Sequence, residues 1–251
     1  MLTRVVTGIA RLLTPRVSSA RLSLLTGGAS PAYAHGAARY PAPMPFDPTP
    51  LLDPDTCAVV VFECQEGVIG DASALPGLAR AVRETDVVGH VATLAEGARR
   101  AGVPVVYATP RQRPGEASPP GTTPLEHRLQ REAGGGDAEA LDMGPVVSAL
   151  APAPGDVVVE RHRGLTGFHG SGLDAALRET GARTVVLVGV SLNIGIPGTA
   201  IEAVNHGYTV VVPPDCVAAD PAEHAEAALR HSIRPVAFMV DSADILAVWS
   251  P

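Results

Sequence analysis

Lysine is absent from this chain of 251 residues, so all 19 of its basic residues are arginine. The absence excludes a lysine general base, a Schiff-base lysine and the lysine of a phosphate-binding P-loop. Long apolar runs are also missing, because Arg, Asp, Gly or Pro interrupts every candidate before it approaches the roughly 18 residues of a membrane-spanning helix. We therefore expect no P-loop chemistry and no membrane partner.

Cysteine is scarce, and its three occurrences are Cys57, Cys64 and Cys216. They show neither C-x-x-C spacing nor an even number, so neither a disulfide framework nor a structural zinc site is indicated. The histidines form no H-E-x-x-H pattern, and the G-x-G-x-x-G fingerprint of dinucleotide binding is missing after the first and fourth apolar strands. These absences predict no metal, no cofactor and a reducing, cytoplasmic location.

Charge is unevenly distributed along the chain. Apolar residues make up 46% and charged residues 18%, which is typical of a folded protein. Residues 1–43 carry five arginines and no acid, so residues 44–251 have 14 basic and 26 acidic residues, a net charge of −12 that argues against nucleic-acid binding.

The composition divides the chain into a leader, residues 1–50, and one domain, residues 51–251. Arginines interrupt the apolar stretches of the leader, which argues against a secretory signal peptide. A mitochondrial transit peptide remains an alternative. We favour a disordered tail, or a start assigned too early with Met44 as the true start.

Strands and helices alternate through the domain. Apolar segments predict strands at residues 57–63, 103–108, 157–159, 184–190, 208–212 and 236–240. Helical patterns occupy residues 87–101, 171–180, 195–206 and 220–234, and residues 110–140 predict a long irregular loop. This alternation predicts an α/β fold with an open parallel sheet, helices on both faces and a binding site at the carboxyl ends of the strands.

Residues able to support chemistry follow three of these strands. Glu63 follows an apolar strand, where partly dry surroundings would raise its pKa, although a solvated or Arg-paired carboxylate is the commoner case. His162 stands between two arginines, a pattern more typical of a surface basic cluster than of a proton-transfer group. Gly195 opens a helix after a strand, so its amide suits an oxyanion or carboxylate, but relief of a tight turn explains this glycine equally well.

Several longer motifs resemble a known family. They are VVFECQ at residues 60–65, GLTGFHGSGL at residues 164–173, GVSLNIGIPGTA at residues 189–200 and GYTVVVPPD at residues 207–215. In order and spacing they resemble the isochorismatase-like hydrolases over roughly residues 55–250. The resemblance implies a six-stranded parallel sheet of Rossmann-like topology, a homo-oligomer and a cis peptide near Val190–Ser191.

Most members of that family use an Asp, Lys and Cys triad, in which the Cys attacks an amide or nitrile carbon. The resemblance places Glu63 at the Asp position, His162 at the Lys position and Gly195 at the Cys position. Attack by a thiol at the usual place is therefore excluded. The isochorismatases proper also look to have Gly at the Cys position and cleave a vinyl ether by acid catalysis, so the departures are compatible with an enzyme.

The favoured hypothesis is a hydrolase that acts without a cysteine nucleophile on a small polar molecule, with Glu63 as general acid or base, His162 as its partner and the Gly195 amide as anion donor. Substrate contacts are expected from Arg111, Arg161, Arg163, Ser191 and Asn193. Cys64 is a weaker candidate nucleophile, because neighbouring side chains of a strand point to opposite faces.

Two other hypotheses remain open. All three triad positions differ from the family pattern, which motivates a catalytically inactive member that binds a small ligand or serves as an oligomeric scaffold. A true isochorismatase is less favoured, because residues 108–113 do not resemble the polar and aromatic stretch of those enzymes.

Overall fold

The computed structural model describes residues 47–71, 73–111, 122–132 and 143–250. They belong to a compact unit that runs Asp47–Pro251. The predicted leader, residues 1–50, lies outside the described residues except for residues 47–50. Two short 3-10 helices, η1 (Thr49–Leu51) and η2 (Pro54–Thr56), lead into the first strand.

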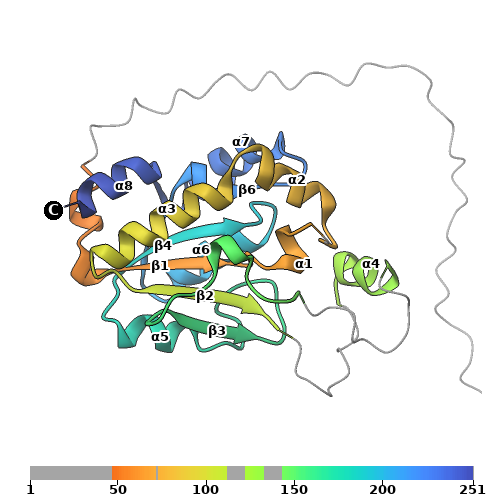
Figure 1. Cartoon of the computed structure of the whole chain (residues 1–251), viewed down its shortest axis with the longest axis horizontal. Coiled ribbons are helices and arrows are strands. Elements are labelled where there is room, and N and C mark those ends of the chain that lie inside the picture. Colours follow the sequence, from red (N-terminus) through yellow and green to blue (C-terminus); the bar gives the residue numbers. More distant parts are fainter. Residues whose placement is uncertain (1–46, 72, 112–121, 133–142, 251) are drawn as a thin grey trace, which may run out of the picture. The chain divides into compact units, whose positions relative to one another are not determined.

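A parallel sheet forms the centre of this unit (Figure 1). Its strands are β1 (Cys57–Phe62), β2 (Val105–Pro110), β3 (Val157–Arg161), β4 (Thr184–Val190), β5 (Thr209–Val212), β6 (Val217–Ala218) and β7 (Phe238–Met239). The strand order is β3-β2-β1-β4-β5-β7, and β6 pairs with β4. Every pairing between these strands is parallel, so the predicted sheet is confirmed, with the short β6 as an additional strand.

The central strands β1 and β4 are buried on both faces because their sequences are continuously apolar. Side chains alternate along β1: Val59 and Val61 enter one core cluster, while Val60 and Phe62 enter the other. Phe62 is in register with residues of both β2 and β4. The residue that follows Phe62 therefore emerges at the carboxyl edge of the sheet, between two neighbouring strands.

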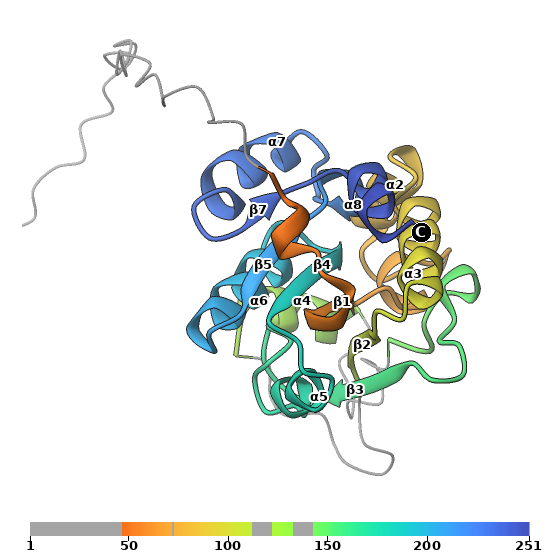
Figure 2. The same ribbon diagram turned by 90° about the vertical axis from the view of Figure 1, so that its left-hand side faces the viewer.

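Helices cover both faces of the sheet (Figure 2). One face packs against α2 (Pro76–Glu84), α3 (Val87–Arg100) and α8 (Ser242–Trp249). The other packs against α5 (Leu173–Glu179), α6 (Gly195–Asn205), α7 (His224–Ala228) and the π-helical turn η6 (Leu229–Ile233). Smaller elements are α1 (Glu66–Ile69), α4 (Pro124–Glu132), η4 (Ser148–Leu150) and η5 (Pro214–Cys216). Among the described residues, no helix is long and apolar enough to cross a membrane.

Several predicted elements have ends shifted by one or two residues, and two predicted segments differ more. The helix predicted for residues 220–234 begins at His224 as α7 and continues from Leu229 as the π-helical turn η6, so Asp220 and Pro221 do not open it. The loop predicted for residues 110–140 contains helix α4, whose first residue is Pro124. Proline suits the first turn of a helix, so here it marks a helix start and not only a loop.

Candidate active site

Glu63 follows β1 directly and has an unusual backbone. Its φ of 54° lies in the left-handed region, which side-chain-bearing residues rarely adopt and which is concentrated at functional sites. The Glu63 amide still donates to the carbonyl of Ala108 in β2, at 3.1 Å. Its side chain is 20% exposed. The carboxyl group therefore lies at the carboxyl edge of the sheet, largely buried but reachable.

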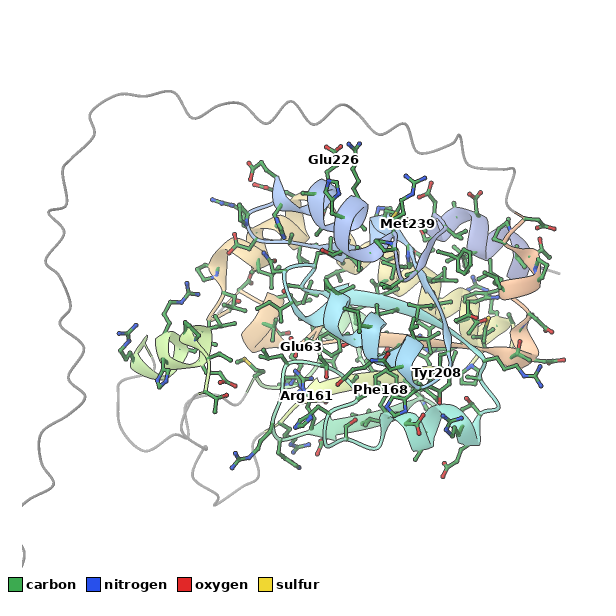
Figure 3. All side chains as sticks on the ribbon, turned by 180° about the vertical axis from the view of Figure 1, so that it is seen from behind. Glu63, Arg161, Phe168, Tyr208, Glu226 and Met239 are labelled. Atoms are coloured by element: carbon green, nitrogen blue, oxygen red, sulfur yellow. The ribbon has the colours of Figure 1, made fainter. Side chains whose placement is uncertain are left out.

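Arg161, the last residue of β3, is the cation that faces Glu63. Its Nη2 donates to Oε1 of Glu63, and its Nε donates to the carbonyl of Gly164 at 3.3 Å. Figure 3 shows the two labelled side chains close together at one end of the sheet. The Arg161 side chain is 5% exposed, so the guanidinium is buried.

The prediction that His162 pairs with Glu63 is not what the structure shows. Arg161 shares a sheet face with Val159, two residues earlier, and the next residue points away because side chains alternate. His162 is exposed, and its Nδ1 lies 2.6 Å from the carbonyl oxygen of Arg111. Counting back from Phe168 without a gap assigns His162 to the Lys position of the family triad. In the structure it is Arg161 that faces Glu63.

Phe62 fills the space beside Gly195. A Cβ atom at residue 195 would lie 2.5 Å from Cε1 of Phe62, a distance that real Cβ atoms do not show. The same ring lies under the guanidinium of Arg161, whose Cζ is 5.1 Å from the ring centroid, within cation–π range. Phe62 is fully buried. The ring thus supports Arg161 and leaves no room for a side chain at the first residue of α6.

Burial dominates the electrostatics of Glu63. Loss of hydration raises the pKa of the carboxyl above its ordinary value, while the charge of Arg161 and its hydrogen bond lower it, with a net upward direction. Burial and the neighbouring Glu63 charge raise the pKa of the Cys64 thiol to about 12. Cys64 packs with Val59 and Val61 on the α3 side of the sheet, so its thiol is protonated and points into the core.

Two further arginines predicted to bind substrate are close to Arg161: Arg163 follows it by two residues, and Arg111 follows Pro110, which pairs with Arg161 between β2 and β3. Arg111 pairs through Nη1 with Glu160, and its amide donates to the carbonyl of Arg161 at 2.9 Å. Arg163 is exposed. Their roles in substrate binding stay predictions.

The predicted segment after β4 is present with the backbone that the resemblance implies. The Val190–Ser191 peptide is cis, and Ser191 is half-buried. Asn193 is exposed, and its side-chain amide forms two hydrogen bonds with the backbone of Asp220: Nδ2 donates to the carbonyl at 2.7 Å, and Oδ1 accepts from the amide at 3.0 Å. Asn193 therefore holds the loop before α7, and a role in substrate binding remains a prediction.

Two residues near the site carry polar atoms without partners. Nη1 of Arg161 and Oε1 of Gln65 are buried and have no hydrogen-bond partner among the described residues. Nε2 of Gln65 donates to the carbonyls of Pro110 and Gly144 at 3.1 and 2.6 Å. Neither Gln65 nor Phe62 is among the predicted site residues. The signal for Gln65 is a polar residue just after an apolar strand.

No donor set for a metal ion assembles within the described residues, since no three His, Cys, Asp or Glu side chains converge. The expectation of no metal rests on the sequence and stays a prediction.

Comparison with known proteins assigns the family. The model of the isochorismatase domain matches residues 57–244 of this chain. The chain belongs to the isochorismatase family of hydrolases. Its relatives include the ureidoacrylate amidohydrolase RutB of Methylorubrum extorquens, 30% identical over 82% of this chain and 86% of the relative. They also include the uncharacterised isochorismatase family protein YecD of Escherichia coli O157:H7, 29% identical over 78% and 97%.

Solved structures agree with this isochorismatase-family fold. The N-carbamoylsarcosine amidase of Thermoplasma acidophilum is 29% identical and superimposes with a TM-score of 0.57, over 74% of this chain and 96% of that chain. A cysteine hydrolase of Pseudomonas syringae pv. phaseolicola has a TM-score of 0.64 at 24% identity, over 78% and 93%, and supports the fold alone.

Proposed function

We propose that this isochorismatase-family hydrolase acts without a cysteine nucleophile on a small polar molecule, with Glu63 as general acid or base. The observation that carries the proposal is the setting of Glu63. It is a largely buried carboxyl group whose pKa is raised by burial, and it follows the Phe62 ring that leaves no room for a thiol at residue 195.

A raised pKa suits both directions of proton transfer. A carboxyl group that keeps its proton nearer neutral pH can protonate a leaving group or a vinyl carbon, and its ionised form can take a proton from water. Arg161 holds the ionised form in place through a charge-assisted hydrogen bond. Arg161 thereby takes the partner role that the sequence assigns to His162.

The names of the relatives guide the choice of substrates. An ureidoacrylate amidohydrolase and an N-carbamoylsarcosine amidase make ureides and amides the first compounds to test, and the family name adds vinyl ethers such as isochorismate. Nitriles complete the panel. We further propose a small molecule as the partner, a homo-oligomer as the working form and the cytoplasm as the compartment.

The experiment measures turnover of this panel by liquid chromatography and mass spectrometry with the wild type, Glu63→Gln and Cys64→Ala. The wild type and Cys64→Ala are expected to consume the same substrate, while Glu63→Gln loses about 10²- to 10⁴-fold in rate, the usual contribution of general acid–base catalysis. Glu63→Asp keeps the acid, and retention of part of the activity in that variant separates loss of the acid from loss of the fold.

Absence of turnover by every variant, with folding and assembly unchanged, favours the alternative of an inactive member that binds a small ligand or serves as a scaffold. A fully active Glu63→Gln contradicts the role of Glu63.

A further inference from the structure

The buried guanidinium of Arg161 has more donors than partners. Its Nη2 donates to Glu63, its Nε donates to the carbonyl of Gly164, and one face of the group lies over the ring of Phe62. Nη1 is buried without a partner among the described residues. An unpaired buried donor is costly, more so on a charged group, and in native proteins it often indicates a catalytic or ligand-binding role.

The charge balance at this site depends on the protonation of Glu63. Within the described part of the chain, Glu63 is the carboxylate that forms an ion pair with Arg161. A general acid must be protonated before it reacts, whereas arginine stays charged. The acid-competent form of the site therefore holds a buried cation without its counter-ion, which is unfavourable. An incoming negative charge would restore the balance.

The exposed fractions of the pair show how a ligand can reach Arg161. The Arg161 side chain is 5% exposed and the Glu63 side chain 20%. Glu63 is the more accessible member of the pair and occupies Nη2, so a ligand that binds Nη2 takes the place of this carboxylate. Nη1 and Nη2 then form the free edge of a planar donor pair, the geometry that matches the two oxygens of a carboxylate.

We propose that the substrate carries a carboxylate, and that this carboxylate replaces Glu63 as the counter-ion of Arg161. The inference rests on the proposed function, in which Glu63 is the acid. In the exchange one proton passes from solvent to the released Glu63 carboxylate, and no other bond forms or breaks. The substrate thus creates the protonated acid that its own conversion requires.

The surroundings of Glu63 favour this proton uptake. Among the described residues, two ionisable groups interact electrostatically with Glu63: Arg161 on β3 and the thiol of Cys64. The Cys64 thiol is protonated, because burial raises its pKa to about 12. Burial raises the pKa of Glu63 and Arg161 lowers it. When a ligand carboxylate neutralises Arg161, the effect of burial is no longer opposed, and the pKa of Glu63 rises further.

Calorimetric titration of the full chain with acetate tests the exchange without any turnover. Acetamide is the neutral control of the same shape, and buffers of different ionisation enthalpy report proton uptake. At a pH above the pKa of Glu63 in the free protein, where the titrations are run, we expect one proton to be taken up with each acetate, and the affinity to fall about tenfold with each further pH unit. Acetamide is expected to bind without proton uptake or not at all.

Variants assign the two partners. Arg161→Met is expected to abolish acetate binding, and Arg161→Lys, which keeps the charge but not the planar donor pair, to weaken it. Glu63→Gln is expected to bind acetate with a pH-independent affinity and no proton uptake. Arg100→Met is the control, because this α3 side chain is 67% exposed and pairs with Glu96 one turn earlier. This variant should bind acetate with the affinity and the proton uptake of the wild type.

Lack of acetate binding by the wild type, binding that persists in a folded Arg161→Met, or binding without proton uptake overturns this inference. The proposed function survives each of these results if Glu63→Gln still abolishes turnover. Full turnover by Glu63→Gln removes the proposed function, whatever acetate does.

Discussion

The side chain of Phe62 restricts position 195 to glycine. The ring of Phe62 occupies the volume into which any side chain at residue 195 would project, and the ring is fully buried. Because Phe62 also lies under the guanidinium of Arg161, the ring cannot move aside without disturbing the partner of Glu63. A thiol is therefore excluded by packing as well as by sequence.

Replacing Gly195 by alanine is expected to lower the free energy of unfolding by about 1–3 kcal/mol, the usual cost of overpacking a core. Urea unfolding measures the change. Gly172→Ala is the control, because a Cβ there would meet its nearest neighbour, Cγ1 of Val159, at 4.0 Å. Equal stability of the two alanine variants would show that Phe62 does not fill the space at residue 195.

The raised pKa of Glu63 predicts a pH dependence of stability. A carboxyl group whose pKa is higher in the folded state binds its proton more tightly there, so its contribution is greatest below the unfolded pKa, about 4.3, and is lost as pH rises through the folded pKa. The wild type should lose stability relative to Glu63→Gln over that window, by at most about 1.4 kcal/mol per pH unit. Denaturant unfolding across pH checks this, and a difference that grows in the opposite direction contradicts it.

The sequence predicts Glu63 as a site residue but not its partner. An acid after an apolar strand indicates a dry carboxyl group, and the structure places it so. Arg161 and His162 are adjacent, so their side chains point to opposite faces, and only one of them can face Glu63. Motif spacing does not determine which one, because a shift of one residue exchanges the two. The position of Phe62 depends on packing between β1 and α6, which no local pattern reports.

Helix α6 holds the loop that follows β3. The hydroxyl of Thr199 accepts a hydrogen bond from the buried amide of Gly167 at 3.0 Å, and Thr166 donates to Glu202. The same loop supplies the Gly164 carbonyl that accepts from Arg161. The loop and α6 therefore position the guanidinium together.

Thr199→Val removes one acceptor while keeping the shape of the side chain. The variant is expected to lose about 1–3 kcal/mol of unfolding free energy, because the Gly167 amide is left buried and unpaired. Thr93→Val is the control, since this exposed hydroxyl bonds only the carbonyl of Gly89 in its own helix, and a change within about 0.5 kcal/mol is expected. Thermal and urea unfolding compare them, and an equal loss in both variants contradicts the role of Thr199.

Helices and strands are predicted best where a single sequence pattern, such as a continuous apolar run, defines them. The strand Thr184–Val190 has the predicted bounds, because a continuous apolar run defines it. The helix predicted for residues 220–234 starts late, at His224, because Asp220 is bonded to Asn193 of a distant loop and does not cap the helix. Helices α1, α2 and α8 are missing from the predicted elements; each has fewer than three turns, so its periodic apolar pattern is brief.

The whole molecule carries an apolar stripe on its surface. Ile201 and Val204 of α6 and Ile194, which directly precedes this helix, are 46%, 43% and 44% exposed, and the spacing of the two helical residues places them on one face. Isolated exposed apolar residues are normal, but three on and directly before one helix favour an interface. The stripe supports the proposed homo-oligomer.

Ile201→Arg is expected to reduce the mass in solution while leaving the circular dichroism spectrum unchanged, because a charge would be buried between copies. Light scattering after size exclusion measures the mass. Met239→Gln is the control, with a side chain that is 37% exposed and belongs to β7 and not to α6. A monomeric wild type would contradict the interface.

At the scale of the molecule, the fold follows from the sequence more securely than the chemistry does. Alternating apolar strands and helices predict the parallel sheet and its two covered faces, and the match to the isochorismatase domain agrees with this fold. Chemistry depends on side-chain directions at that edge, where the left-handed backbone of Glu63 breaks the alternation of β1.

The most direct test of the account is the ratio of kcat/KM between the wild type and Glu63→Gln on the first substrate that the panel yields. The account predicts a loss of about 10²- to 10⁴-fold, with circular dichroism and assembly unchanged. Equal kcat/KM in the two proteins would contradict the central claim that the carboxyl group of Glu63 performs the chemistry.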